Sequence, residues 1–178
     1  MSGRRITVPA GRVVRPTSER VREALASALE ARLGSFAGLS VLDLYAGSGA
    51  VGLELLSRGA SAVTFVESEL SVVHVLRGNV NNLGLHGASV LHTRAEAVTV
   101  PRATASAKRF GVVFDIVFID PPYALDIDPV LTAAAPYASR VLIAERAVKS
   151  PDPTWPEGFE EPQVRRYRDT ALWYGWRS

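Results

Sequence analysis

Apolar residues along this chain follow two alternating patterns, helical spacing and short continuous runs. The first helical pattern begins near Glu19 and ends at Gly34. The next segment, Leu39 to Tyr45, is apolar except at Ser40 and Asp43, which is typical of a strand buried on both faces of a sheet. The same alternation predicts further helices over 50–58, 70–83 and 128–138, and further strands over 62–67, 88–93, 114–119 and 140–145.

The C-terminal part of the chain has a different pattern. A proline-rich stretch over 150–162 is predicted to be a loop, and strands over 164–167 and 170–176 are predicted to form a hairpin. No internal repeat, heptad pattern or long linker divides the chain. We therefore predict one α/β domain with a doubly wound, mostly parallel seven-stranded sheet that ends in an antiparallel hairpin.

The composition narrows the class of protein. The 178 residues are 47% hydrophobic and 21% charged, which is enough to build a substantial core. No apolar run is long enough to span a bilayer and the N-terminus does not resemble a signal peptide, so a soluble cytoplasmic protein is expected. The absence of cysteine excludes a disulfide scaffold, a thiol nucleophile and a zinc-thiolate site.

Positive charge is concentrated at the N-terminus. Residues 1–22 carry six arginines and one acid, Glu19, although the whole chain has a net charge of only +2. Because arginine presents a forked set of donors that matches phosphate, this segment suggests a nucleic-acid partner; the alternative is a solvated tail. We predict a basic extension over 1–22 and a single domain over 23–178. The candidate nucleic-acid contacts are Arg4, Arg5, Arg12, Arg15, Thr17, Arg20 and Arg22.

A glycine-rich motif comes after the first predicted strand. Gly47, Gly49 and Gly52 fit the spacing G-x-G-x-x-G at the start of a predicted helix, where backbone N–H groups can approach a ligand. Glu67 lies 20 residues after Gly47, at the end of the next predicted strand, where a carboxylate would accept both hydroxyls of a ribose. The motif therefore favours a ligand that contains a nucleoside. Glycines used only for tight packing are the alternative.

The acid Asp43 discriminates between the possible nucleosides. It lies four residues before Gly47 and would repel the pyrophosphate of a dinucleotide at the helix start. It would suit a ligand that carries an amino group and a sulfonium, as S-adenosylmethionine does. A purely structural role as an acceptor for the N–H groups of the loop is also open.

A second motif, Asp120-Pro121-Pro122-Tyr123, ends the fourth predicted strand. An exocyclic amine on a base is a poor nucleophile because its lone pair is delocalised into the ring. The carboxylate of Asp120 and the carbonyl of Pro121 could hold the protons of such an amine, while Tyr123 offers a face for a flipped base. The alternative is a strand-ending turn with an exposed ring.

The two motifs together resemble the class I S-adenosylmethionine-dependent N-methyltransferases that carry a D/N-P-P-Y/F motif. A closer resemblance is to the RsmD family, the bacterial enzymes that methylate N2 of a guanine in 16S ribosomal RNA. It extends over nearly the whole chain. The segments that carry it are R-P-T-S-E-R-V-R-E over 15–23, Gly52-Leu53-Glu54, Ser57-Arg58-Gly59-Ala60 and Tyr167-Arg168-Asp169-Thr170.

The resemblance implies a Rossmann-like methyltransferase fold, S-adenosylmethionine as methyl donor, no metal, and 16S ribosomal RNA within an assembling or assembled small subunit as substrate. We further expect a monomer with no membrane partner, and phosphate contacts made by the N-terminal residues named above. The residues implied to bind the donor are Asp43, Tyr45, Gly47, Gly49, Glu67, Arg94, Ala95 and Glu96. Those implied at the reaction centre are Asp120, Pro121, Pro122 and Tyr123.

Two departures from the family pattern concern its N-terminus and its adenine site. A short R-I-I-G-G-like segment that family members usually carry is missing before Gly3. The acid or amide that commonly precedes an alanine after the third strand is here Arg94, followed by Ala95, with Glu96 one step late.

Three other functions stay open at this point. A methyltransferase of the same motif class could act on DNA adenine or on a protein glutamine. A nicotinamide-dependent oxidoreductase is opposed by Asp43 and by the Asp120 motif. A nonenzymatic RNA-binding module with a relict pocket is the third. Glu145, at the end of the fifth predicted strand, points to the same rim and could either pair with an arginine or touch substrate.

Overall fold

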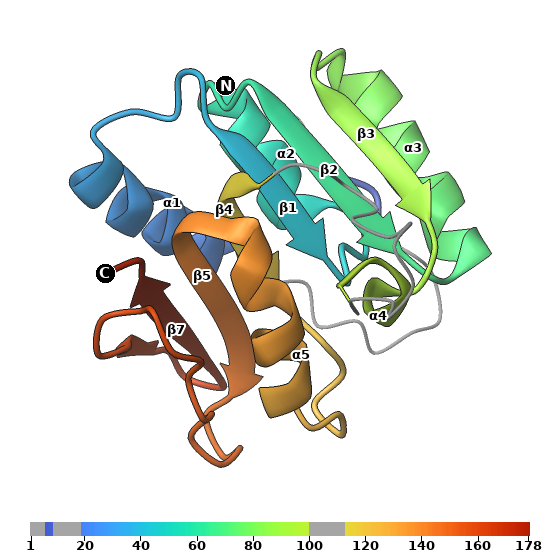
Figure 1. The fold of residues 1–178 in the computed structure, drawn as a ribbon. Helices are drawn as coiled ribbons and strands as arrows, with labels where there is room; N and C mark the ends of the chain where they lie inside the picture. Colours follow the sequence, from blue (N-terminus) through green and yellow to red (C-terminus); the bar gives the residue numbers. More distant parts are fainter. Residues whose placement is uncertain (1–5, 9–18, 100–112) are drawn as a thin grey trace, which may run out of the picture.

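The structure is a computed structural model that describes residues 6–8, 19–99 and 113–178. One seven-stranded sheet with the order β3-β2-β1-β4-β5-β7-β6 forms the centre of the molecule (Figure 1). The first five strands pair in parallel, and the last two pair antiparallel. The predicted fold class is confirmed. The strands are β1 Ser40–Leu44, β2 Ala62–Glu67, β3 Ala88–His92, β4 Phe114–Ile119, β5 Ala138–Ala147, β6 Gln163–Arg166 and β7 Thr170–Trp176.

Helices cover both faces of the sheet, because successive residues of the central strands point to opposite faces and are apolar on each. Val41 and Ile116 pack on one face with α1, α2 and α3, whereas Leu42 and Val117 pack on the other with α4 and α5 (Figure 1). The helices are α1 Glu19–Leu33, α2 Ala50–Ser57, α3 Leu70–Leu83, α4 Ala95–Thr99 and α5 Asp128–Ala134, followed by the 3-10 helix η1 Ala135–Tyr137.

The helix predicted over 128–138 is shorter than expected. It ends at Ala134, continues as a single 3-10 turn through Tyr137, and β5 begins at Ala138. Pro136 explains the change, since it lacks the N–H that an α-helix needs at that position. The five-residue helix α4 was not predicted, because it is too short to show a helical period.

The order of the strands creates a switch point beside β1. This strand pairs with β2 on one side and with β4 on the other, so the chain leaves the carboxyl ends of β1 and β4 in opposite directions. Ligands of open α/β sheets bind in the crevice that such a divergence creates. The fold therefore directs attention to the residues that come directly after β1 and β4.

The C-terminal end of helix α1 lies at the opposite, amino edge of the sheet. Arg32, in its last turn, lies 4.4 Å above the ring of Trp176. Trp176 pairs with Val141 near the start of β5, which places the end of α1 at the amino edge of the sheet. The first turn of α1, with Arg20 and Arg22, is therefore the end nearer the carboxyl edge.

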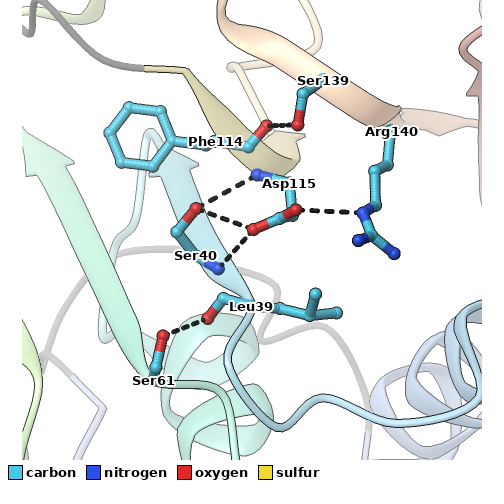
Figure 2. Close-up of polar contacts among 7 residues, drawn as sticks. All are labelled: Leu39, Ser40, Ser61, Phe114, Asp115, Ser139 and Arg140. Carbon is cyan, nitrogen blue, oxygen red and sulfur yellow. Dashed lines mark hydrogen bonds and ion pairs between the residues drawn. The ribbon is translucent and has the colours of Figure 1, made fainter.

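A set of polar contacts, here called the amino-edge network, joins β1, β4 and β5 at the amino edge (Figure 2). One oxygen of Asp115 accepts hydrogen bonds from the backbone N–H (2.9 Å) and the hydroxyl (3.0 Å) of Ser40. Its other oxygen forms an ion pair with Arg140 at 3.0 Å. The hydroxyl of Ser139 donates to the carbonyl of Phe114 at 3.0 Å. The network ties three neighbouring strands together at fixed positions.

We predict that Asp115→Ala lowers the free energy of unfolding by about 1–3 kcal/mol, because it removes the acceptor of two hydrogen bonds and leaves Ser40 and Arg140 without it. Urea denaturation would measure the change. Asp152→Ala is the control, since the side chain of Asp152 is 71% exposed and its contact to Arg166 is 3.5 Å long. Equal effects of the two substitutions would contradict the role given to the network.

Candidate active site

The glycine motif forms a loop between β1 and α2. Gly47 and Gly49 have φ values of 55° and 81°, in the left-handed region that favours glycine. A Cβ on Gly49 would lie 2.3 Å from Leu76, and one on Gly52 would lie 2.3 Å from Phe65, so close packing explains these two glycines. A Cβ on Gly47 would meet nothing closer than 4.0 Å. Packing therefore does not account for Gly47, whose surroundings are open.

The carboxylate of Glu67, at the end of β2, is held in place by backbone donors. One oxygen accepts from the N–H of Gly47 at 2.9 Å. The other accepts from the N–H groups of Ser68 (2.8 Å) and Glu69 (2.9 Å). These bonds join the glycine loop to the start of α3 and fix the carboxylate at the edge where the ribose was predicted.

Asp43 is buried beneath the loop and is only 2% exposed. Its carboxylate accepts the N–H of Gly52 at 3.1 Å, which is the structural role that the sequence left open. Burial raises its pKa to about 8, a rise that the bond from Gly52 reduces and the nearby Glu67 and Glu145 increase. A cationic group beside Asp43 would reverse this rise by stabilising the ionised form.

The Asp-Pro-Pro-Tyr motif leaves β4 next to the glycine loop. Leu44 pairs with Ile119, and the N–H of Asp120 reaches the carbonyl of Leu44 at 3.4 Å. Pro121 is buried, whereas Pro122 and Tyr123 are exposed, with 37% of Tyr123 accessible. The structure therefore brings this motif and the glycine loop together at the switch point.

A third carboxylate joins Asp43 and Asp120. Glu145 is 3% exposed and comes directly after Ala144, the partner of Ile119 across β4 and β5. Burial raises the pKa of Asp120 well above its usual range, and the charges of Glu145 and Asp43 raise it further, while Arg146 lowers it. We call Asp43, Asp120 and Glu145 the acidic cluster. The position of Glu145 on the same rim is as the sequence indicated.

Tyr45 comes directly after β1, and the residues predicted near the adenine, 94–96, follow β3. Tyr45 has a φ of 61°, and its hydroxyl donates to Glu96 at 2.9 Å. Ala95 is 3% exposed and begins α4, whereas the side chain of Arg94 is exposed. The structure thus connects Glu96, and not Arg94, to the loop that leaves β1.

Asn79 is a site residue that the motifs did not reveal. Its side-chain amide donates to the carbonyls of Ser48 (3.0 Å) and Thr7 (2.9 Å), and its oxygen accepts the N–H of Thr7 at 2.9 Å. It therefore ties the N-terminal segment to the glycine loop. The only signal in the sequence was a polar residue three positions after Leu76 on the buried face of α3.

The predicted nucleic-acid contacts are only partly described. Arg20 lies exposed and Arg22 half-buried in the first turn of α1. The other five lie outside the described residues: Arg4, Arg5, Arg12, Arg15 and Thr17.

Residues 1–176 match the family described as Conserved hypothetical protein 95. The chain belongs to this family, the RsmD family. It is 36% identical over 121 residues to Ribosomal RNA small subunit methyltransferase D of Escherichia coli (strain K12). That alignment covers 68% of this chain and 56% of the relative, so the chain spans little more than half the length of that curated relative.

Solved structures resemble this RsmD-family chain over most of its length. The putative methyltransferase yhhF from Escherichia coli has a TM-score of 0.80 and 28% identity, with 99% of this chain and 93% of that one covered. Magnesium protoporphyrin IX methyltransferase from Synechocystis PCC 6803, solved with bound SAM, has a TM-score of 0.66 and 17% identity, with 89% and 79% covered. The second likeness shows the Rossmann-like methyltransferase fold alone.

In the described part of the chain, no helix is long and apolar enough to cross a membrane. Nor do residues 6–8, 19–99 and 113–178 contain a group of three or more His, Cys, Asp or Glu side chains arranged to hold a metal ion.

Proposed function

We propose that this chain is an S-adenosylmethionine-dependent methyltransferase that modifies the exocyclic N2 of a guanine in 16S ribosomal RNA. The observation that carries the proposal is the meeting of Asp43 and Asp120 at one switch point, on neighbouring strands. One acid suits a cationic donor and the other suits an amine acceptor. The name of the Escherichia coli relative supports RNA of the small ribosomal subunit as the substrate.

The donor fits the residues that surround the glycine loop. Glu67, already fixed by three backbone N–H groups, would accept both ribose hydroxyls. Asp43 would face the amino acid end of the donor, where a positive charge compensates a buried carboxylate that accepts a hydrogen bond from Gly52. The donor supplies a methyl group on a sulfonium, which becomes a neutral thioether when the methyl leaves.

The adenine would lie beside Ala95 and Tyr45. Family members commonly read adenine with an acid or amide one position before the alanine, where this chain has the exposed Arg94. Glu96 takes that role here, because its carboxylate is already directed to the loop by the hydroxyl of Tyr45.

The acceptor amine would be held by Asp120 and by the carbonyl of Pro121. These two acceptors bind the two protons of N2 and direct its lone pair at the methyl carbon, in line with the breaking C–S bond. As the C–N bond forms, the nitrogen gives up a proton to the carboxylate of Asp120. A carboxylate with a raised pKa takes up such a proton more readily than an ordinary one does.

The RNA would be held by stacking and by phosphate contacts. The ring of Tyr123 is accessible to a base that has left its helix. Arg20 and Arg22 lie at the end of α1 nearer the same edge, where they would contact phosphates. The name of the Escherichia coli relative refers to RNA of the small ribosomal subunit, and the substrate that we propose is this RNA within the assembled particle.

Donor binding is expected to release a proton from Asp43. Because the pKa of Asp43 is about 8 in the free protein, its carboxyl is mostly protonated at neutral pH, and a bound cation would ionise it. Titration calorimetry in buffers of different ionisation enthalpy should show the release of up to about one proton per donor at pH near 7. Affinity should therefore rise as pH increases from about 6 to about 7.5.

Asp43→Asn is the matched variant for that measurement. It keeps an oxygen for the N–H of Gly52 but has no proton to release, and its affinity should fall about 10- to 100-fold. Proton release of the same size in this variant would contradict the assignment of Asp43 to the donor's cationic end.

The reaction is tested by transfer of a labelled methyl group from S-adenosylmethionine to small-subunit particles and to free 16S RNA that lack the modification. Nucleoside analysis should identify N2-methylguanosine, formed mainly in the particles. Asp120→Ala should lower the rate by about 10²–10⁴-fold, since the amine loses its main acceptor. Asp126→Ala, an exposed aspartate six residues later, is the control and should transfer at the wild-type rate.

Two outcomes would overturn parts of this proposal. A label found only in DNA adenine or in a protein glutamine would replace the substrate. Donor binding without transfer to any of these substrates would favour an RNA-binding module.

A further inference from the structure

Arg146 is a buried arginine on β5 that contacts the turn after Pro122. It is 5% exposed, and it pairs with Ala171 of the neighbouring strand β7. One of its terminal nitrogens, Nη2, donates to the carbonyl of Tyr123 at 3.0 Å and to the carbonyl of Leu125 at 3.1 Å. These carbonyls belong to the segment directly after Pro122, so one guanidinium group fixes the turn that carries Asp120 and Tyr123.

Arg146 and Glu145 lie on opposite faces of the sheet. Glu145 is two residues after Ile143 and faces the acidic cluster, whereas Arg146 is two residues after Ala144 and faces the side covered by α5. The hydrogen bonds from Arg146 to Tyr123 and Leu125 therefore bring the turn that follows β4 close to the end of β5. The end of β5 thus supplies a negative group, Glu145, to the acidic cluster and a positive group, Arg146, to the turn after Pro122.

Stability alone does not explain an arginine at this position. The other terminal nitrogen, Nη1, is buried and has no hydrogen-bond partner within the described part of the chain. Burying a charged group with an unpaired nitrogen is unfavourable, and apolar side chains of similar volume often replace buried charges without loss of stability. A functional role would explain why an arginine is present here.

We propose that Arg146 is a positioning residue for methyl transfer: it fixes the turn after Pro122 and supplies positive charge beside the acidic cluster. The proposal rests on the function proposed above. Arg146 does not touch the reacting atoms. Its effect on the reaction passes through the position of the turn and through the charge on Asp120.

The positive charge of Arg146 changes the pKa of Asp120 in the direction opposite to that of the neighbouring carboxylates. Asp43 on β1 and Glu145 on β5 raise the pKa of Asp120, as burial does, and Arg146 lowers it. Without Arg146 the pKa of Asp120 would rise further, so the ionised carboxylate would form only at a higher pH. If transfer needs that carboxylate, the rise of kcat with pH would move to higher pH in a variant that lacks the charge.

Arg146→Met, Arg146→Lys and the control Arg140→Met separate the two effects. Arg140 lies on the same strand but pairs with Asp115 at the opposite edge. Arg146→Met should lower kcat about 10- to 100-fold and move its pH dependence upward, with donor affinity changed less than about two-fold. Arg146→Lys keeps the charge and should keep the wild-type pH dependence, but lose part of kcat because it lacks the forked geometry. Arg140→Met should change neither.

Hydrogen exchange gives a measurement that does not depend on activity. The N–H of Leu125 donates to the carbonyl of Pro122 at 2.8 Å within the turn that Arg146 holds. Its exchange should be faster in Arg146→Met and unchanged in Arg140→Met.

Two results would overturn the proposal: unchanged exchange at Leu125, or wild-type kcat and pH dependence in Arg146→Met. Equal loss of kcat in Arg140→Met would also overturn it, because it would indicate general destabilisation. Failure of the wild type to methylate any guanine would instead remove the proposed function. In that case exchange at Leu125 still decides whether Arg146 fixes the turn.

Discussion

The parallel pairing of β1 with β4 is the constraint on which the site depends. It brings the carboxyl ends of the two strands level, and the glycine loop and the Asp-Pro-Pro-Tyr turn leave the sheet there in opposite directions. A shift of one residue in this pairing would turn Asp43 or Asp120 to the other face of the sheet. Ser40 and Asp115 of the amino-edge network also join β1 to β4 at the other end of the strands, which stabilises the pairing (Figure 2).

The acidic cluster is electrostatically unfavourable in the free protein. The buried Asp43 and Glu145 and the half-buried Asp120 lie close enough to raise the pKa of Asp43 and Asp120. A cationic donor would offset the charge at Asp43, and Arg146 lowers the pKa of Asp120. The cluster thus suits a reaction in which a positive charge enters with one substrate and a proton leaves the other.

Patterns in the sequence predicted the site residues that stand at the ends of parallel strands. Asp43, Glu67 and Asp120 each lie at or near the end of an apolar run, and such ends meet at one edge of a parallel sheet. The partners of Asn79 and Arg146 could not be predicted, because those contacts join residues 72 and 23 positions apart that no local pattern relates. Local chemistry also overrode periodicity where Pro136 ended a helix early.

The central claim is that one switch point holds the donor by Asp43 and Glu67 and the acceptor by Asp120. A crystal structure with S-adenosylhomocysteine and a guanosine nucleotide tests it most directly. The account predicts both ribose hydroxyls of the adenosine on Glu67 and the guanine N2 within hydrogen-bonding distance of Asp120, at about 2.7–3.2 Å. A guanine bound with N2 directed away from Asp120, or an adenosine bound elsewhere, would contradict it.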